Sequence, residues 1–196
     1  MKKIIGLTGG IATGKSAVTS ILRELDFVVI DADAVVHELQ RPGGTLYQAL
    51  FKKFGSDFFE TDGQLNRKKL ADLVFNDNSA YKQLSDLQGR LIRQELETRR
   101  AAEITRSEQT FFMDIPLLFE GHYESLFDEI WLVTVPEDVQ IERLMSRSGL
   151  SREEAAARIA RQMPMAEKLR LADVILDNSA TLSDLRLQIL EQLKRL

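Results

Sequence analysis

Apolar residues gather in five short runs along the chain, and each run is nearly continuous rather than alternating with polar residues. Continuous apolar runs of this length are typical of parallel strands that helices cover on both faces. Segments with helical spacing of apolar residues separate these runs, so the pattern predicts an α/β fold with a five-stranded parallel sheet. The predicted strands are Ile4–Thr8, Phe27–Asp31, Phe111–Ile115, Ile130–Val135 and Val174–Leu176.

The strands are unevenly spaced. About eighty residues lie between the second and the third strand, far more than a crossover needs. Helical patterns fill this gap, including a long one from Ala80 to Ile104, and predict a helical insertion over residues 34–110. A second, charged excursion covers residues 145–170, which leaves residues 1–33, 111–144 and 171–196 as the predicted core. The last helix should cover one face of the sheet with the stripe Leu182, Leu185, Ile189, Leu193 and Leu196.

The turn after the first strand reads GGIATGKS, which is the pattern G-x-x-x-x-G-K-S of a phosphate-binding loop (P-loop). Glycines allow backbone conformations that a Cβ would forbid, so that consecutive N–H groups point at a phosphate. We expect Lys15 to reach the β- and γ-phosphates and the Ser16 hydroxyl to bind Mg²⁺. The strand before the loop and the helix after it place the phosphates at a helix N-terminus. The predicted ATP-binding residues here are Gly9, Gly10, Ala12, Thr13, Gly14, Lys15, Ser16 and Ala17.

Acidic residues stand at the ends of the second and third strands, where ligands bind in open α/β sheets. Asp31 and Asp33 could coordinate Mg²⁺ or accept a proton from a substrate hydroxyl. Asp33 is the predicted base, with Asp31 as its structural partner. In an extended segment the two side chains would point the same way. The alternative is that one of them caps a helix that starts near residue 34. Asp114 either holds Mg²⁺, through water, or caps a turn.

Two arginines and an asparagine follow the fourth and fifth strands. Arg143 and Arg147 are four apart on a predicted helix and share one face. Either could stabilise charge on the transferred phosphoryl group, or both could lie on a solvated face. We favour Arg147 because it begins the second excursion. Asn178 either hydrogen-bonds an adenine edge or closes a turn.

Composition narrows the function classes. The chain has 196 residues, a net charge of −4 and no cysteine, which excludes disulfides, a thiol nucleophile and cysteine-based zinc sites. The negative charge argues against a broad nucleic-acid surface. No apolar run approaches a membrane span, so we expect no membrane partner and a cytoplasmic location. The oligomeric state stays open. The insertion's phenylalanines are expected in its core rather than in a cofactor cage: Phe51, Phe54, Phe58 and Phe59.

Several motifs together resemble one enzyme family over essentially the whole chain. They are LTGGIATGKS, then DAD and Pro42-Gly43, LNRKKLADLVF, MDIPLLFE and ARIARQM. This set is similar to the dephospho-coenzyme A (dephospho-CoA) kinase family. The resemblance implies a three-layer P-loop fold of the nucleoside and nucleotide kinase type, with a helical acceptor-binding insertion and a lid. It also implies ATP-dependent phosphorylation of the ribose 3′-hydroxyl of dephospho-CoA, the last step of coenzyme A synthesis.

The resemblance also implies site residues. Asp33 would accept the 3′-hydroxyl proton, Arg147 would belong to the lid, and Arg67 would help to hold the acceptor. The residues that line the acceptor pocket would be Pro116, Leu117, Leu118 and Phe119, although apolar residues just outside a strand could equally be core. The chain departs from the family pattern at Ala12, Thr13, Ala17 and Gly89-Arg90. An alanine fits at position 12 if its φ is negative.

Two other functions remain open from the residues alone. A kinase with a nucleoside or nucleoside monophosphate as acceptor could use the basic residues of the insertion. A nucleotide-dependent switch would need a guanine-reading N-K-x-D after a late strand, and the segment Leu176–Ser179 does not match it.

Overall fold

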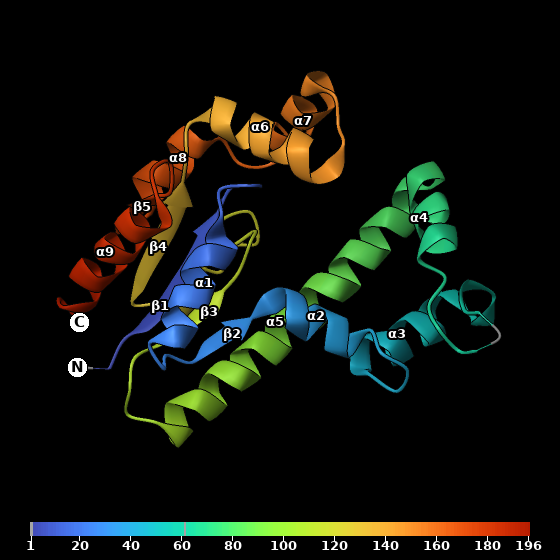
Figure 1. Cartoon of the computed structure of the whole chain (residues 1–196). Helices are drawn as coiled ribbons and strands as arrows, with labels where there is room; N and C mark the ends of the chain where they lie inside the picture. The colour runs from blue at the N-terminus through green and yellow to red at the C-terminus, as the bar shows by residue number, and fades with distance from the viewer. Residues whose placement is uncertain (1, 61) are drawn as a thin grey trace. The chain divides into compact units, whose positions relative to one another are not determined.

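A computed structural model of the chain describes residues 2–60 and 62–196, apart from the side chains of residues 67, 71 and 74–76. Its five parallel strands form one sheet in the order β2-β3-β1-β4-β5 (Figure 1). The strands are β1 (Ile4–Gly9), β2 (Val29–Asp31), β3 (Phe111–Asp114), β4 (Glu129–Thr134) and β5 (Val174–Asp177). This confirms the predicted α/β class and all five strands, with boundaries that differ by one or two residues.

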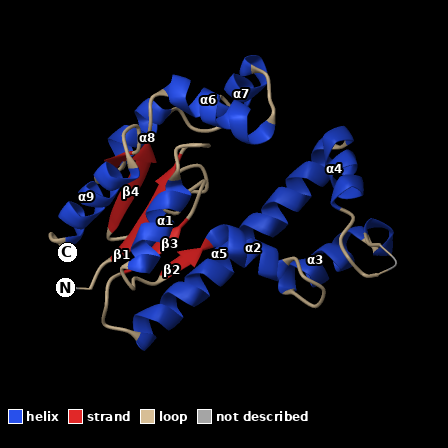
Figure 2. Ribbon diagram, in the orientation of Figure 1, coloured by secondary structure: helices blue, strands red, loops and turns tan. Residues whose placement is uncertain are grey.

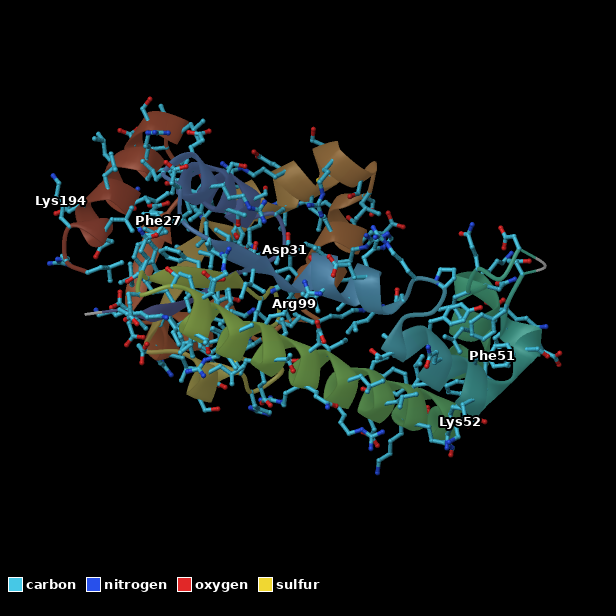
Figure 3. The ribbon with its side chains drawn as sticks, turned by 90° about the horizontal axis from the view of Figure 1, so that it is seen from below. Phe27, Asp31, Phe51, Lys52, Arg99 and Lys194 are labelled. Atoms are coloured by element: carbon cyan, nitrogen blue, oxygen red, sulfur yellow. The ribbon has the colours of Figure 1, made fainter. Side chains whose placement is uncertain are left out.

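The largest boundary difference is at β2, which begins at Val29 rather than at Phe27. Phe27 precedes the strand and packs edge-on against Phe112 of β3, with ring centroids 5.5 Å apart and an interplanar angle of 89° (Figure 3). Phe27 is therefore apolar because it packs in the core, although it is not part of the strand.

Helices connect the strands (Figure 2). The α-helices are α1 (Lys15–Glu24), α2 (Ala32–Leu39), α3 (Thr45–Phe54), α4 (Arg67–Asn76), α5 (Asn78–Arg106), α6 (Glu137–Ser148), α7 (Arg152–Ile159), α8 (Met165–Leu171) and α9 (Leu182–Leu193). Short 3₁₀ helices are η1 (Ser56–Phe58) and η2 (Glu124–Leu126). No helix within the described residues is both long and apolar enough to cross a membrane.

The chain divides into two compact units, each of which makes most of its contacts within itself. One runs from the start of the chain to Asp31 and from Ser107 to Leu196, and it holds the sheet. The other, Ala32–Arg106, is helical and holds α2, α3, α4 and α5.

The main core of the sheet unit lies between the sheet and helices α1 and α9. Alternate residues of β1 and β4 face these helices, because successive side chains of a strand point to opposite faces. The buried residues of this core are Ile5, Leu7, Val18, Ile21, Leu22, Phe112, Trp131, Val133, Leu176, Leu185 and Ile189.

The stripe predicted for the last helix is confirmed except at its first position. Leu185 and Ile189 are fully buried, and Leu193 and Leu196 pack beside them. Leu182 is 62% exposed, so the prediction for it was wrong. It is the first residue of α9, directly after the capping residue Thr181, and it precedes the turns that reach the core.

The long helix α5 organises the helical unit, since α2, α3 and α4 all contact it. Arg99 of α5 pairs with Glu38 of α2 at 2.5 Å and with Glu95 of its own helix at 2.8 Å (Figure 3). The helix runs without a break through Gly89, where an added Cβ would meet no neighbouring atom. The Gly89-Arg90 departure therefore leaves the helix continuous.

The expectation of a phenylalanine core in the insertion was wrong for Phe51, which is 47% exposed (Figure 3). The buried side of α3 is formed by Leu46 and Leu50, and the residue after Leu50 lies about 100° further round the helix. The aromatic rings instead pack on one another. Phe51 lies 5.1 Å from Phe59 and Phe54 lies 6.0 Å from Phe58, measured between ring centroids.

Candidate active site

The phosphate-binding sequence forms the turn between β1 and α1, as its pattern predicts. Gly9 ends β1, and Lys15 is the first residue of α1. Gly14 has φ 88°, a left-handed conformation that favours glycine. An added Cβ at Gly14 would lie 2.0 Å from the side-chain nitrogen of Asn178. The second glycine of the motif is therefore required both by its backbone conformation and by close packing.

Ala12 also adopts the left-handed conformation, with φ 61°. The condition for alanine at this position, a negative φ, is not met. A left-handed residue with a Cβ costs about 1–2 kcal/mol, because the Cβ approaches the following carbonyl oxygen. Ala12 is half-buried and packs on a small apolar cluster formed by Ile141, Leu144 and Ala155. The loop is thus strained at Ala12, and the strain is offset in part by this packing.

Lys15 forms an ion pair with Asp114, the last residue of β3. The Asp114 carboxylate is nearly fully buried and also accepts a hydrogen bond from the Thr19 hydroxyl at 2.9 Å. Burial raises the pKa of Asp114 above its ordinary value, more than the opposing effects of Lys15 and Thr19 lower it. Thr19 was not singled out in the sequence. Its signal is its position one helical turn after Lys15, on the same face of α1.

The two aspartates of the DAD segment do not alternate along an extended chain. Asp31 ends β2 opposite Asp114 in the sheet, and Ala32 already begins α2. The expected common direction of Asp31 and Asp33 therefore fails, because the helix starts two residues earlier than predicted. Asp31 is half-buried and lies 3.9 Å from Arg23 of α1. Asp33 is exposed in the first turn of α2, within the helical unit.

Asn178 and Arg143 brace the phosphate-binding loop. The Asn178 side-chain nitrogen donates to the Thr13 carbonyl oxygen at 2.8 Å, and Arg143 donates to the Asn178 carbonyl oxygen at 2.9 Å. The backbone N–H of Asn178 donates to Thr134 at the end of β4. These contacts fit a role in holding the loop, and one of them uses a donor of the side-chain amide.

Two glutamines that the sequence argument passed over hold the same loop at Ile11. Gln140 of α6 donates to the Ile11 carbonyl oxygen at 2.7 Å. The Gln162 side-chain oxygen accepts from the Ile11 N–H at 2.8 Å. Gln162 lies in the sequence ARIARQM, which carries the family resemblance, and Gln140 lies three residues before Arg143. Their place in the sequence could have drawn attention to them. Their common partner, Ile11, lies 129 residues from Gln140 and 151 residues from Gln162, and it was not predictable.

The segment after β3 separates into buried and exposed positions. Leu118 and Phe119 are fully buried, whereas Leu117 is 48% exposed. Leu118 packs so closely on Gly6 of β1 that an added Cβ there would lie 2.7 Å from it. The core alternative therefore fits Leu118 and Phe119, and Leu117 is the one of the three available to a ligand. Pro116 accepts a hydrogen bond from the Thr8 hydroxyl at 3.2 Å.

The remaining candidates are two arginines. Arg147 is exposed in the last turn of α6, close to the Gly149 that ends the helix. Arg143, one turn earlier, is the arginine that contacts the loop, through Asn178 and at 3.5 Å through the Thr13 carbonyl oxygen. Arg67 begins α4, and its side chain lies outside the described part of the chain.

Comparison with known proteins identifies the family. A family model described as dephospho-CoA kinase matches residues 3–184. The chain belongs to the dephospho-CoA kinase family. The dephospho-CoA kinase of Streptococcus mutans is 50% identical over 196 residues, which cover all of this chain and 98% of that relative.

Solved structures agree with a dephospho-CoA kinase fold. The dephospho-CoA kinase from Campylobacter jejuni is 29% identical and superposes with a TM-score of 0.76, over 100% of this chain and 97% of that one. A structure from Thermus thermophilus titled TT1252 is 35% identical with a TM-score of 0.79, over 100% and 98% of the two chains. The sheet order and the P-loop of this dephospho-CoA kinase family member are therefore those of nucleotide-type kinases.

Proposed function

We propose that this member of the family transfers the γ-phosphoryl group of ATP to the 3′-hydroxyl of dephospho-CoA, with Lys15 on the phosphates and Asp33 as the base. The dephospho-CoA kinase activity itself, the final step of coenzyme A synthesis, follows from the family match and from full-length relatives about 50% identical. The geometry supports the roles that we propose for individual residues in phosphate binding, proton transfer and the lid.

The loop from Gly9 to Ser16 binds the phosphates of ATP. Its backbone N–H groups lie at the N-terminus of α1, where the helix dipole favours negative charge. Lys15 adds a mobile positive charge next to that terminus. Asn178 and Arg143 hold the Thr13 carbonyl oxygen, so the loop keeps its shape before the nucleotide arrives. A loop that is already ordered loses little entropy on binding.

The oxygen ligands around Lys15 fit Mg²⁺. The Ser16 hydroxyl and the Asp114 carboxylate are hard oxygen donors, and Mg²⁺ takes one or two such groups together with phosphate oxygens and water. Within the described residues no group of three or more His, Cys, Asp or Glu side chains could hold a metal ion. This agrees with an ion that arrives with the nucleotide. When bound, Mg²⁺ neutralises charge that builds on the phosphates.

Asp33 orients the acceptor hydroxyl and takes its proton. It lies two residues after the carboxyl end of β2 and is exposed in the first turn of α2. The helical unit that contains it is then the acceptor-binding part, with Arg67 as a further contact. In the sheet unit, Leu117 is exposed and Pro116 is half-buried, so Leu117 is the more available of the two to the acceptor.

Residues 145–170 form the lid in this proposal. The segment contains the end of α6, all of α7 and most of α8. A lid excludes water, which would otherwise accept the phosphoryl group in place of the substrate. Exposed Arg147, at the start of the lid, then approaches the transferred group only when the lid closes.

A coupled assay of ADP release tests the proposal. The purified chain is given Mg-ATP alone and then with dephospho-CoA, adenosine or AMP. ADP release that requires dephospho-CoA, with a product phosphorylated at the 3′-hydroxyl, is the expected result. Release with adenosine or AMP instead would keep the kinase fold and overturn the acceptor.

A further inference from the structure

A small apolar cluster, separate from the main core, joins the lid segment to the preceding turns of α6. Ala155 of α7 is fully buried against Ile141 and Leu144 of α6. Ile11 and Ala12 of the phosphate-binding loop pack on the same cluster. The α7 helix and the phosphate-binding loop are therefore joined through one packed cluster.

Space remains beside the packed face of this helix, since Ala156 and Ile159 pack on the cluster and also line a cavity. A cavity of about 740 Å³ lies between α7, the start of α6 and the segment that enters α8, with Gly10, Gln140, Ile159, Gln162 and Met165 among its lining residues. A helix face that borders a cavity makes fewer packing contacts and can shift more readily than a fully packed face. The position of α7 then depends on the contacts of the segment that follows it.

That segment is held at two consecutive residues. The Gln162 side-chain oxygen accepts from the Ile11 N–H at 2.8 Å, which ties the segment to the phosphate-binding loop. The Met163 N–H donates to Oε1 of Glu120 at 3.0 Å, which ties it to the turn after β3. The two bonds join parts of the chain that are 151 and 43 residues apart in sequence.

The second tie rests on a buried ion pair. Nζ of Lys168 lies 2.7 Å from the same Oε1 of Glu120, and the Lys168 side chain is 1% exposed. Oε2 of Glu120 is buried and has no hydrogen-bond partner within the described residues. A buried pair of this kind adds little net stability, because desolvation of both charges offsets their attraction. Its effect is to fix one arrangement of α8 against the turn after β3.

We infer that Gln162, Met163, Glu120 and Lys168 form a lid anchor, which sets the position of the lid relative to the phosphate-binding loop. The inference rests on the proposed function of residues 145–170 as a lid. Gln162 acts as a positioning residue through Ile11 and touches no reacting atom. The anchor makes water exclusion depend on the Gln162 to Ile11 hydrogen bond, since this bond joins the lid to the loop that carries the phosphates.

Two substitutions at Gln162 separate the hydrogen bond from side-chain size. Gln162→Met has a similar volume and no acceptor for the Ile11 N–H. Gln162→Glu is the matched control, since its carboxylate keeps an acceptor at the same place. The readout is the ratio of phosphorylated dephospho-CoA formed to ADP released from Mg-ATP without acceptor. Loss of folded protein lowers both rates equally, so a merely structural role leaves this ratio unchanged.

We expect Gln162→Met to lower the ratio by about tenfold, because water gains access while transfer slows. Gln162→Glu is expected to keep it within about twofold, because the hydrogen bond survives. An unchanged ratio in Gln162→Met, with normal transfer by the wild type, would overturn the anchor alone. An equal fall in both variants would overturn the hydrogen bond as its basis. Absence of dephospho-CoA phosphorylation in the wild type would overturn the proposed function and the anchor with it.

Discussion

The Lys15 ammonium group, assigned to the phosphates of ATP, is paired with the buried Asp114 carboxylate at the end of β3. Thr19 holds the other oxygen of that carboxylate at 2.9 Å. An ammonium group that turns to a phosphate must give up part of its contact with Asp114. In the proposed role of Lys15, ATP competes with Asp114 for the ammonium group, and this exchange lowers the affinity for ATP.

This competition predicts opposite effects of Asp114→Asn on binding and on turnover. Without Mg²⁺, ATP should bind about tenfold more tightly, the factor that corresponds to about 1.4 kcal/mol. With Mg²⁺, turnover should fall by about 10–100-fold, because the carboxylate proposed to hold the ion through water is lost. Titration calorimetry with a chelator present and a turnover assay with Mg²⁺ measure the two effects. Thr19→Val, which keeps the carboxylate, is the control, and equal ATP affinity of Asp114→Asn and wild type without Mg²⁺ would contradict the competition.

Replacement of Asp33 tests the base. Asp33→Asn should lower turnover by about 10²–10⁴-fold, the usual range for loss of a general base, and should leave ATP affinity unchanged. Turnover with dephospho-CoA and ATP binding are measured on the same preparation. Asp57→Asn is the control, because Asp57 is an exposed acid of the same helical unit. Normal turnover in Asp33→Asn would remove Asp33 from the mechanism.

The left-handed conformation of Ala12 predicts a graded response to side-chain shape. Ala12→Val adds a β-branched side chain at φ 61°, so it should cost about 2 kcal/mol and lower the Tm by about 4–8 °C. Ala12→Gly relieves the strain but gives up a half-buried methyl group, and these effects should cancel to within about 1 kcal/mol. Thermal unfolding measures both variants. A valine variant as stable as the wild type would show that the loop is not strained at this residue.

The contacts of Asn178 predict that it braces the loop rather than reads the base. Asn178→Ala leaves the Thr13 carbonyl oxygen without its buried donor, at a cost of about 1–3 kcal/mol. Binding of ATP and of GTP should weaken by the same factor, because the brace acts on the loop and not on the base. Titration with both nucleotides measures the two affinities. A change of more than about threefold in their ratio, about 0.7 kcal/mol, would instead assign Asn178 to base recognition.

The fold was largely predictable because its signals are local. Each strand is a short apolar run, and the phosphate-binding loop is specified by eight consecutive residues from Gly9 to Ser16. The tertiary environment was less predictable. Phe51 is an apolar residue of a type that is common in cores. It lies on a different face of α3 from the buried Leu46 and Leu50 and is exposed. Whether an aromatic residue is buried depends on helix orientation, which the residue type does not carry.

The candidate site shows the same division. Lys15 and Asp114 were found from their places in a motif and at a strand end. The conformation of Ala12 was not found, because φ at one loop residue depends on how the loop is closed. The roles of Gln140 and Gln162 were also missed, since each depends on a partner in a distant segment. Local patterns thus single out candidate ligand-binding groups, and not the groups that hold them in place.

The lowered pKa of Glu120 predicts how stability changes in acid. Burial alone would raise this pKa, but the ion pair with Lys168 and the hydrogen bond from the Met163 backbone outweigh burial and hold the pKa below its ordinary value of 4.5. A carboxyl group with a lowered pKa in the folded state contributes stability above its unfolded pKa. That contribution is lost as the pH falls through the lower, folded value.

The wild type should therefore lose stability as the pH falls below about 4.5, while Glu120→Gln, which cannot titrate, should show a flatter acid limb from a lower starting Tm. The starting Tm is lower because the variant leaves Lys168 buried without its counter-charge. Thermal unfolding between about pH 3 and pH 7 measures both limbs, with Glu142→Gln as the control, since Glu142 is exposed on α6. Parallel acid limbs for Glu120→Gln and wild type would mean that the Glu120–Lys168 pair does not contribute to stability as an ionised pair.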